Sequence, residues 1–223
     1  MTEETLVALL RAKFDPHAIL LYGSRARGDA TAQSDWDVSC IAVDAEPHHY
    51  GWVEDGAFLD VFVYPAFEPP KPEDLRMLGS RILLDEHGLA LPFLQELAAL
   101  DARGPDPLPA HQVAMEKTWI DKTLQRARRG LEDPSDLEAH YRRHWLLRDL
   151  LEYAFTLRNQ WFSGAKAAFA LMQQSDPALY ALFAAAYAPD APFESIERLA
   201  LAVAALEAPR RTDDPLPSSD GVC

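Results

Sequence analysis

Two short apolar runs joined by a segment of glycine and charged residues constrain the fold of this chain most strongly. Residues 18–22 are apolar throughout and end at Gly23-Ser24, and a second apolar run covers residues 38–43. Short apolar runs bounded by turn residues are typical of buried strands. Buried strands need a sheet whose faces are covered, so this segment predicts a small mixed β-sheet with flanking helices.

The Gly23-Ser24 turn lies where the first predicted strand meets a predicted short helix. Glycine lets backbone N–H groups approach an anion closely, and the serine hydroxyl adds a further donor. The start of a helix also carries partial positive charge. Together these properties predict a phosphate-binding turn.

Three aspartates accompany the predicted strands. Asp35 and Asp37 lie two residues apart at the start of the second run, a spacing that on a strand places both on one face and Trp36 on the other. Asp60 stands inside the apolar run 57–64, where an unpaired charge is unfavourable. Converging carboxylates raise one another's pKa, and a bound cation keeps them ionised. Oxygen ligands favour Mg²⁺ or Mn²⁺, so we expect a metal site.

Structural roles are an alternative for the same residues. Gly23-Ser24 can be an ordinary turn, Asp35 and Asp37 can cap a strand, and Asp60 can pair with a buried arginine. The combination of all these features after an apolar strand favours the functional interpretation.

The pattern resembles the signature of the DNA polymerase beta-like nucleotidyltransferase superfamily, specifically its small bacterial branch that includes kanamycin and other aminoglycoside nucleotidyltransferases. That signature is Gly-Ser, a short helix, Asp-x-Asp and a third acid on a later strand. The resemblance covers roughly the first ninety residues, about the size of a small domain. It implies that Asp35, Asp37 and Asp60 are catalytic and hold two Mg²⁺ ions, with Asp60 acting as metal ligand or as base.

The resemblance also implies the nucleotide-binding residues and the reaction. Gly23, Ser24 and Arg25 match the segment that binds the nucleotide, and Lys166 resembles a lysine in the helical part of some relatives. The implied reaction moves AMP from ATP, or a nucleotide from another NTP, onto a hydroxyl of a small acceptor such as an aminoglycoside. Two alternatives stay open: a protein adenylyltransferase of antitoxin type, and a non-catalytic nucleotide-binding module.

Charge and composition restrict the partners. The formal net charge is −14; residues 1–100 hold 7 Lys+Arg against 17 Asp+Glu, and the remainder 14 against 18. Such an acidic first half disfavours a nucleic-acid substrate and attracts a cationic acceptor. The two cysteines make no disulfide framework, and no apolar run has the length of a membrane span. We therefore expect a cytoplasmic protein with no membrane partner; the oligomeric state is not predicted.

The chain divides at a segment rich in proline and glycine. We expect an α+β fold, with a catalytic domain over 1–100, a linker over 101–110, a helical bundle over 111–208 and a disordered tail over 209–223. Within the bundle, Ser135 to Glu138 predicts a capping box that opens a helix reaching about Phe162. One or two basic residues of the bundle are expected to contact the triphosphate, from the set Lys122, Arg126, Arg128, Arg129, Arg142, Arg143 and Arg148.

Overall fold

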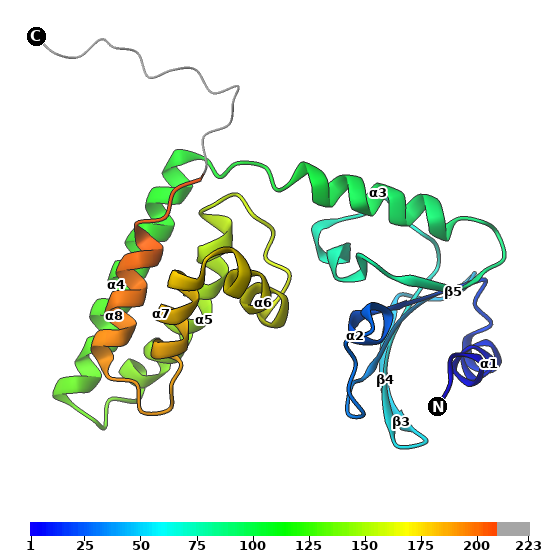
Figure 1. The fold of residues 1–223 in the computed structure, drawn as a ribbon, viewed down its shortest axis with the longest axis horizontal. Helices are drawn as coiled ribbons and strands as arrows, with labels where there is room; N and C mark the ends of the chain where they lie inside the picture. The colour runs from blue at the N-terminus through cyan, green and yellow to red at the C-terminus, as the bar shows by residue number, and fades with distance from the viewer. Residues whose placement is uncertain (209–223) are drawn as a thin grey trace, which may run out of the picture. The chain divides into compact units, whose positions relative to one another are not determined.

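The computed structural model describes residues 1–208 and divides the chain into two compact units, one ending at Arg103 and the other beginning at Gly104 (Figure 1). The first unit is a mixed sheet with helices and the second is helical, which confirms the predicted α+β fold. The predicted tail, 209–223, lies outside the described residues.

The first unit is built around a sheet in the order β3-β4-β2-β1-β5. Strand β1 is antiparallel to both of its neighbours, β2 and β4 are parallel, and β3 forms an antiparallel hairpin with β4. The strands are β1 (Ala18–Tyr22), β2 (Trp36–Ile41), β3 (His48–Glu54), β4 (Ala57–Tyr64) and β5 (Arg81–Asp85). The predicted runs 18–22 and 57–64 are therefore strands with the predicted bounds.

Helix α1 (Glu3–Phe14) covers one face of the sheet (Figure 1). Its apolar spacing places Leu6 and Leu10 against the strands, where both are fully buried. The core on this face is completed by strand residues with the same orientation, among them Ile19, Leu21, Trp36, Val38, Cys40, Leu59, Val61 and Val63. The alternate residues of β2 and β4, which include Asp37 and Asp60, consequently point to the opposite face.

Part of that opposite face is covered by the 3₁₀ helix η1 (Pro72–Met77) and by helix α3 (Ala90–Arg103). Helix η1 packs against β1 and α3, and α3 also packs against β5. Helix α3 continues three residues beyond the predicted domain boundary at 100, and the segment between it and the next helix is 104–109. The short helix α2 (Gly23–Arg27) packs against β1 and β2.

The second unit is formed by α4 (Ala110–Glu132), α5 (Leu137–Thr156), α6 (Ala165–Ser175), α7 (Pro177–Ala186) and α8 (Phe193–Ala204). Helices α4 and α5 pack side by side, and α8 packs against α4, α5 and α7. The core contains the fully buried Leu150, Phe183, Ile196, Leu199 and Val203. Asp176 caps α7, since its side chain accepts a hydrogen bond from the Leu179 N–H.

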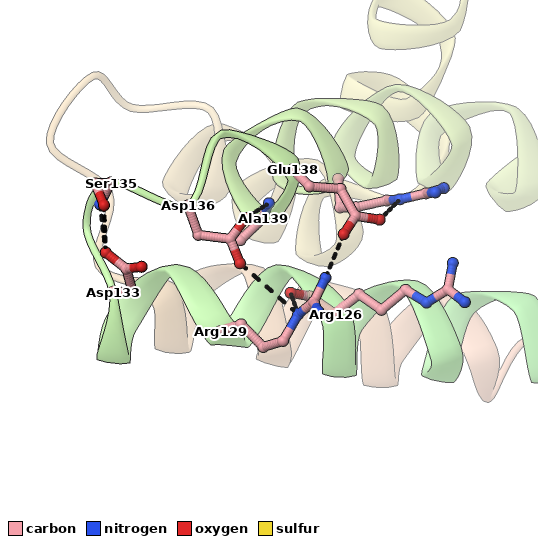
Figure 2. A network of polar contacts seen from close by, with 8 residues as sticks. Arg126, Arg129, Asp133, Ser135, Asp136, Glu138 and Ala139 are labelled. Atoms are coloured by element: carbon pink, nitrogen blue, oxygen red, sulfur yellow. Dashed lines mark hydrogen bonds and ion pairs between the residues drawn. The ribbon is translucent and has the colours of Figure 1, made fainter.

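Two predictions for α5 are wrong. The helix ends at Thr156 rather than near Phe162, because Asn159 has a φ of 54° and turns the chain away from the helical path. The N-cap is Asp136, which accepts from the Ala139 N–H, while the Ser135 hydroxyl donates to Asp133 (Figure 2). The N-cap thus lies one residue later than predicted, because Ser135 is held in its own local turn, and the methyl group of Ala139 at the third helical position cannot complete a capping box.

Candidate functional site

The turn predicted to bind phosphate directly follows β1. Helix α2 begins at Gly23 itself, which has a φ of 70°, a conformation that favours glycine. Ser24 is nearly buried, at 8% exposure, and its carbonyl accepts from the N–H groups of Gly28 and Asp29. Tyr22, Gly23 and Ser24 therefore bring the backbone from the sheet into the short helix in one tight step.

Gly23 also provides space for a carboxylate. A Cβ atom built on Gly23 would lie 2.0 Å from Oδ2 of Asp37. No side chain larger than hydrogen fits there without moving Asp37. The glycine therefore serves two purposes, one conformational and one steric, and it joins the predicted phosphate turn to one of the predicted acids.

Asp37 and Asp60 lie at the same register on neighbouring strands. The parallel pairing of β2 with β4 sets Asp37 opposite Asp60, and the antiparallel pairing of β1 with β2 sets Tyr22 opposite Asp37. Neighbouring strands are about 4.8 Å apart, so the two acids are adjacent on one face of the sheet. The structure thus brings together Asp37, Asp60 and the turn at Gly23.

The ring of Tyr22 lies within the electrostatic field of both acids. Burial raises the pKa of the Tyr22 hydroxyl above its usual range, and the charges of Asp37 and Asp60 raise it further. The positive charge of Arg76 opposes this rise. Tyr22 therefore remains a neutral phenol at physiological pH and borders the site as a hydrogen-bonding group.

His49 is the partner of Asp60 that the sequence analysis missed. Its Nε2 atom bonds to Oδ1 of Asp60, and its ring stacks flat on Phe62 with ring centres 4.1 Å apart. The Asp60 side chain is 28% exposed, so it does not lie in the closed apolar environment that its sequence neighbours suggest. The side chain that contacts Asp60 is a histidine from the adjacent strand rather than an arginine.

The hairpin register explains how His49 could have been found. The turn at Asp55-Gly56 pairs Glu54 with Ala57, which places Gly51 opposite Asp60 and His49 on the diagonal. Diagonal neighbours on one face of an antiparallel pair are within reach of long and aromatic side chains.

Asp35 departs from the predicted arrangement. It precedes β2, which begins at Trp36, and is exposed, so Asp35 and Asp37 do not share a strand face. The physical reason is Arg25, whose Nε donates to the carbonyls of Ser34 and Asp35, both at 3.1 Å. The guanidinium also packs over the Trp36 ring, 4.4 Å from its centre. Arg25 thus holds the backbone of the segment that leads into β2.

Arg76 of η1 is a second residue that the sequence analysis did not select. Its Nη2 donates to the Tyr64 hydroxyl at 2.9 Å, and its guanidinium lies 4.0 Å from the centre of the Phe62 ring. Phe62 and Tyr64 follow Asp60 at alternate positions of β4 and share its face. Arg76 therefore places a positive charge on the same side of the sheet as the two paired acids.

Several basic residues of the helical unit bind acidic neighbours. Arg129 donates to Glu138 at 2.6 Å and lies 3.9 Å from Asp136 (Figure 2). Arg142 contacts the same Glu138. Arg128 pairs with Glu197, and Arg143 donates to the Ala191 carbonyl. These contacts connect α4 and α5 to their neighbours and give the arginines a structural role. Lys166 lies in the first turn of α6, in the same unit.

Aromatic residues of the helical unit contact one another. Trp119 and Trp145 pack edge to face with ring centres 5.8 Å apart, and the Tyr141 ring centre lies 5.5 Å from that of Trp145.

In residues 1–208, no helix is both long and apolar enough to cross a membrane.

The carboxylates that fit a divalent cation are Asp37 and Asp60. They offer hard oxygen donors at one register, beside the space that a Cβ of Gly23 would fill. Over the described part of the chain, no group of three or more His, Cys, Asp and Glu side chains has the arrangement needed to hold a metal ion. A third ligand from Asp35 would have to come from the exposed segment before β2.

No protein-family model and no curated protein matches this chain. Among solved structures, the chain is similar to a nucleotidyltransferase-like protein from Exiguobacterium sibiricum. The two are 14% identical with a TM-score of 0.43, and the match covers 90% of this chain and 71% of the other. A likeness at this level assigns no family, so the function is argued from the residues themselves.

Proposed function

We propose that this protein is a nucleotidyltransferase that moves AMP from ATP onto a hydroxyl of a small acceptor and releases pyrophosphate. The observation that carries the proposal is the juxtaposition of Asp37 with Asp60 on two parallel strands, directly beside the Gly23-Ser24 turn. A phosphate-binding turn and a pair of carboxylates at one edge are the elements that transfer at a phosphorus atom requires.

In the proposed reaction, the acceptor oxygen forms a bond to the α-phosphorus of ATP while the bond between that phosphorus and the oxygen that bridges it to the β-phosphate breaks. The acceptor hydroxyl loses its proton, and the pyrophosphate leaves with the electron pair of the broken bond. Gly23 and Ser24 would hold the phosphates through backbone N–H groups and the serine hydroxyl.

The metal ion is a proposal of its own. Asp37 and Asp60, with Asp35, would hold Mg²⁺ or Mn²⁺, which when bound supplies positive charge to the attacking and leaving oxygens. Asp60 can also accept the proton of the acceptor hydroxyl, because it combines partial exposure with the support of His49 at Oδ1. His49 would then orient the carboxylate as a positioning residue.

The acidic first half of the chain supports a cationic acceptor over a nucleic acid, since nucleic-acid binding depends on neutralising phosphates with Lys and Arg. An aminoglycoside has this character. A cytoplasmic location would bring the protein to ATP and Mg²⁺ together.

Isotope labelling tests the proposal and its alternatives. The purified chain is incubated with Mg²⁺, a panel of aminoglycosides or a protein extract, and ATP labelled at either the α- or the γ-phosphate. We expect α-label on a small molecule and γ-label in pyrophosphate. Label on a protein would favour the antitoxin type, and ATP bound with no pyrophosphate released would favour a non-catalytic module. Asp37→Asn is the inactive control.

A further inference from the structure

A cavity of about 280 Å³ opens in the first unit on the face of the sheet that carries Asp37 and Asp60. Its floor includes Ser39 and Ile41 of β2 and Tyr64 of β4, which continue the alternation of the two acids along their strands. Strand residues rise about 3.3 Å each, so the Ser39 Cα lies roughly 7 Å from the Asp37 Cα. The cavity is thus next to the paired acids.

Ser39 marks the cavity as a place for a polar ligand group. The residue is 2% exposed and lines the cavity. A hydroxyl can both donate and accept a hydrogen bond, so it suits either kind of polar ligand atom. A polar atom of a ligand could therefore bind to Ser39 on the floor of the cavity.

The walls are apolar and aromatic. Phe67 and Phe93 stack with ring centres 4.9 Å apart, and Met77 of η1 adds a flexible side chain. Aromatic faces bind rings and attract cations. The wall therefore favours a ring with a positive charge at its edge.

The rim is acidic. Glu68, Glu73 and Asp74 line the cavity with Lys71, which pairs with Glu68 at 2.9 Å. Because Lys71 pairs with Glu68, the carboxylates of Glu73 and Asp74 give the rim an excess of negative charge. Such an excess attracts a cationic group and disfavours an anionic one.

The volume sets the size of the occupant. A volume of about 280 Å³ is near the lower end of the range for small-molecule pockets. That space suits one substituted ring of an acceptor, and the rest of a larger acceptor would lie outside the cavity.

We infer that this cavity is the acceptor subsite and binds a single apolar ring carrying an amine, with the acceptor hydroxyl directed toward Asp37 and Asp60. The inference rests on the proposed function for the identity of the ligand as the acceptor. The ring contacts Phe67, Phe93 and Met77, a polar substituent reaches Ser39, and the amine faces Glu73 and Asp74.

Binding without nucleotide or metal tests the subsite separately from transfer. Tyramine, a ring with an amine and a hydroxyl, is titrated into the full chain, with neutral 4-ethylphenol as the matched probe. We expect tyramine to shift the NMR resonances of Ser39 and Phe93 and to bind about fivefold more tightly than 4-ethylphenol. Equal affinity for the two probes, or no shift at these residues, overturns the inference.

Three variants complete the test. Glu73→Gln should weaken tyramine binding about fivefold and leave 4-ethylphenol unchanged, whereas Glu96→Gln, on the exposed side of α3, should change neither. Ser39→Ala should weaken the binding of both probes, because it removes the hydroxyl that the polar substituent reaches. If tyramine binds in this way but no acceptor is adenylylated, the proposed function fails and the cavity remains a cation-binding site. Unaltered tyramine binding in both Glu73→Gln and Ser39→Ala overturns the subsite itself.

Discussion

Oδ2 of Asp37 occupies the space in which a Cβ atom of Gly23 would lie, 2.0 Å from the position of that atom. Gly28, at the other end of the same short helix, also has a positive φ, but a Cβ there would meet nothing within 4 Å. A comparison of substitutions at Gly23 and Gly28 therefore separates the effect of backbone strain, which both share, from the effect of displacing the Asp37 carboxylate, which only Gly23 has.

Gly23→Ala and Gly28→Ala should both lower the free energy of unfolding by about 1–2 kcal/mol, since alanine is strained at positive φ. Only Gly23→Ala should also abolish adenylyl transfer, because its methyl group displaces Asp37. Unfolding curves and initial rates measured on the same preparations check this. Full activity in Gly23→Ala would show that the position of Asp37 is irrelevant to the reaction.

Asp35 and Asp37 occupy different environments, one exposed before β2 and the other on the strand. We expect Asp35→Ala and Asp37→Ala each to reduce turnover more than about 100-fold, as loss of a metal ligand does, while circular dichroism stays unchanged. Near-wild-type activity in either variant would make the metal assignment wrong for that residue.

His49 and His48 are adjacent on β3 but point to opposite faces of the sheet, and His49 is the one that contacts Asp60. His49→Ala should lower kcat about tenfold with little change in the KM for ATP, because the Asp60 carboxylate loses its orientation. His48→Ala is the control and should keep the wild-type kcat. Partial recovery in His49→Gln, whose amide can still donate to Asp60, would support a positioning role; equal losses in the His48 and His49 variants would contradict it.

Substitution of Arg25 distinguishes two roles for its side chain, which are holding the backbone of Ser34 and Asp35 and binding the nucleotide. Its guanidinium donates to the Ser34 and Asp35 carbonyls, so Arg25→Met should lower kcat by releasing the segment before β2. The Kd for ATP, measured by calorimetry, should change by less than about threefold. A large rise in that Kd with kcat preserved would instead assign Arg25 to the phosphates, as the family resemblance implies.

Asp176 gives the helical unit a defined acid sensitivity. The Arg158 side chain, which donates to Asp176 at 2.6 Å, and the Leu179 N–H hold the pKa of this carboxyl below its usual range. A carboxyl whose pKa is lowered on folding stabilises the protein above its unfolded pKa, and this contribution is lost as the pH falls through the lowered folded pKa.

Asp176→Asn keeps a capping side chain but removes the charge, so it should destabilise the protein by about 1 kcal/mol at pH 7. The difference from wild type should shrink as the pH falls below about 4, where free carboxyls titrate. Urea unfolding at pH 7 and pH 3 measures it, with the exposed Asp190→Asn as control. A difference that is independent of pH would rule out the ion pair as its source.

Local patterns were enough to predict most elements of the first unit. The apolar runs 18–22 and 57–64 are strands with the predicted bounds. In each of these segments the local pattern of apolar residues is enough to predict the secondary structure, because that pattern follows from burial of the segment in the core. The turn at Gly23 and the shared edge of Asp37 and Asp60 followed from the same patterns.

The errors arise where a distant residue decides the local structure. Asp35 leaves the strand because Arg25, ten residues earlier, takes its carbonyl, and Ser135 loses the cap because Asp133 binds it. The spacing of residue types along the chain predicts neither of these two hydrogen bonds, since each depends on the direction in which a side chain points in the folded protein.

The amino-acid sequence by itself determined the α+β class, and it gave the Gly23-Ser24 turn and the three aspartates as candidate site residues, because each depends on residue type and short-range periodicity. The tertiary structure alone decided that Asp37 fills the space above Gly23, that His49 binds Asp60, and that Ser39 lines a cavity with Phe93. These three contacts depend on strand register and on the packing of α3 over the sheet, which join residues far apart in the chain.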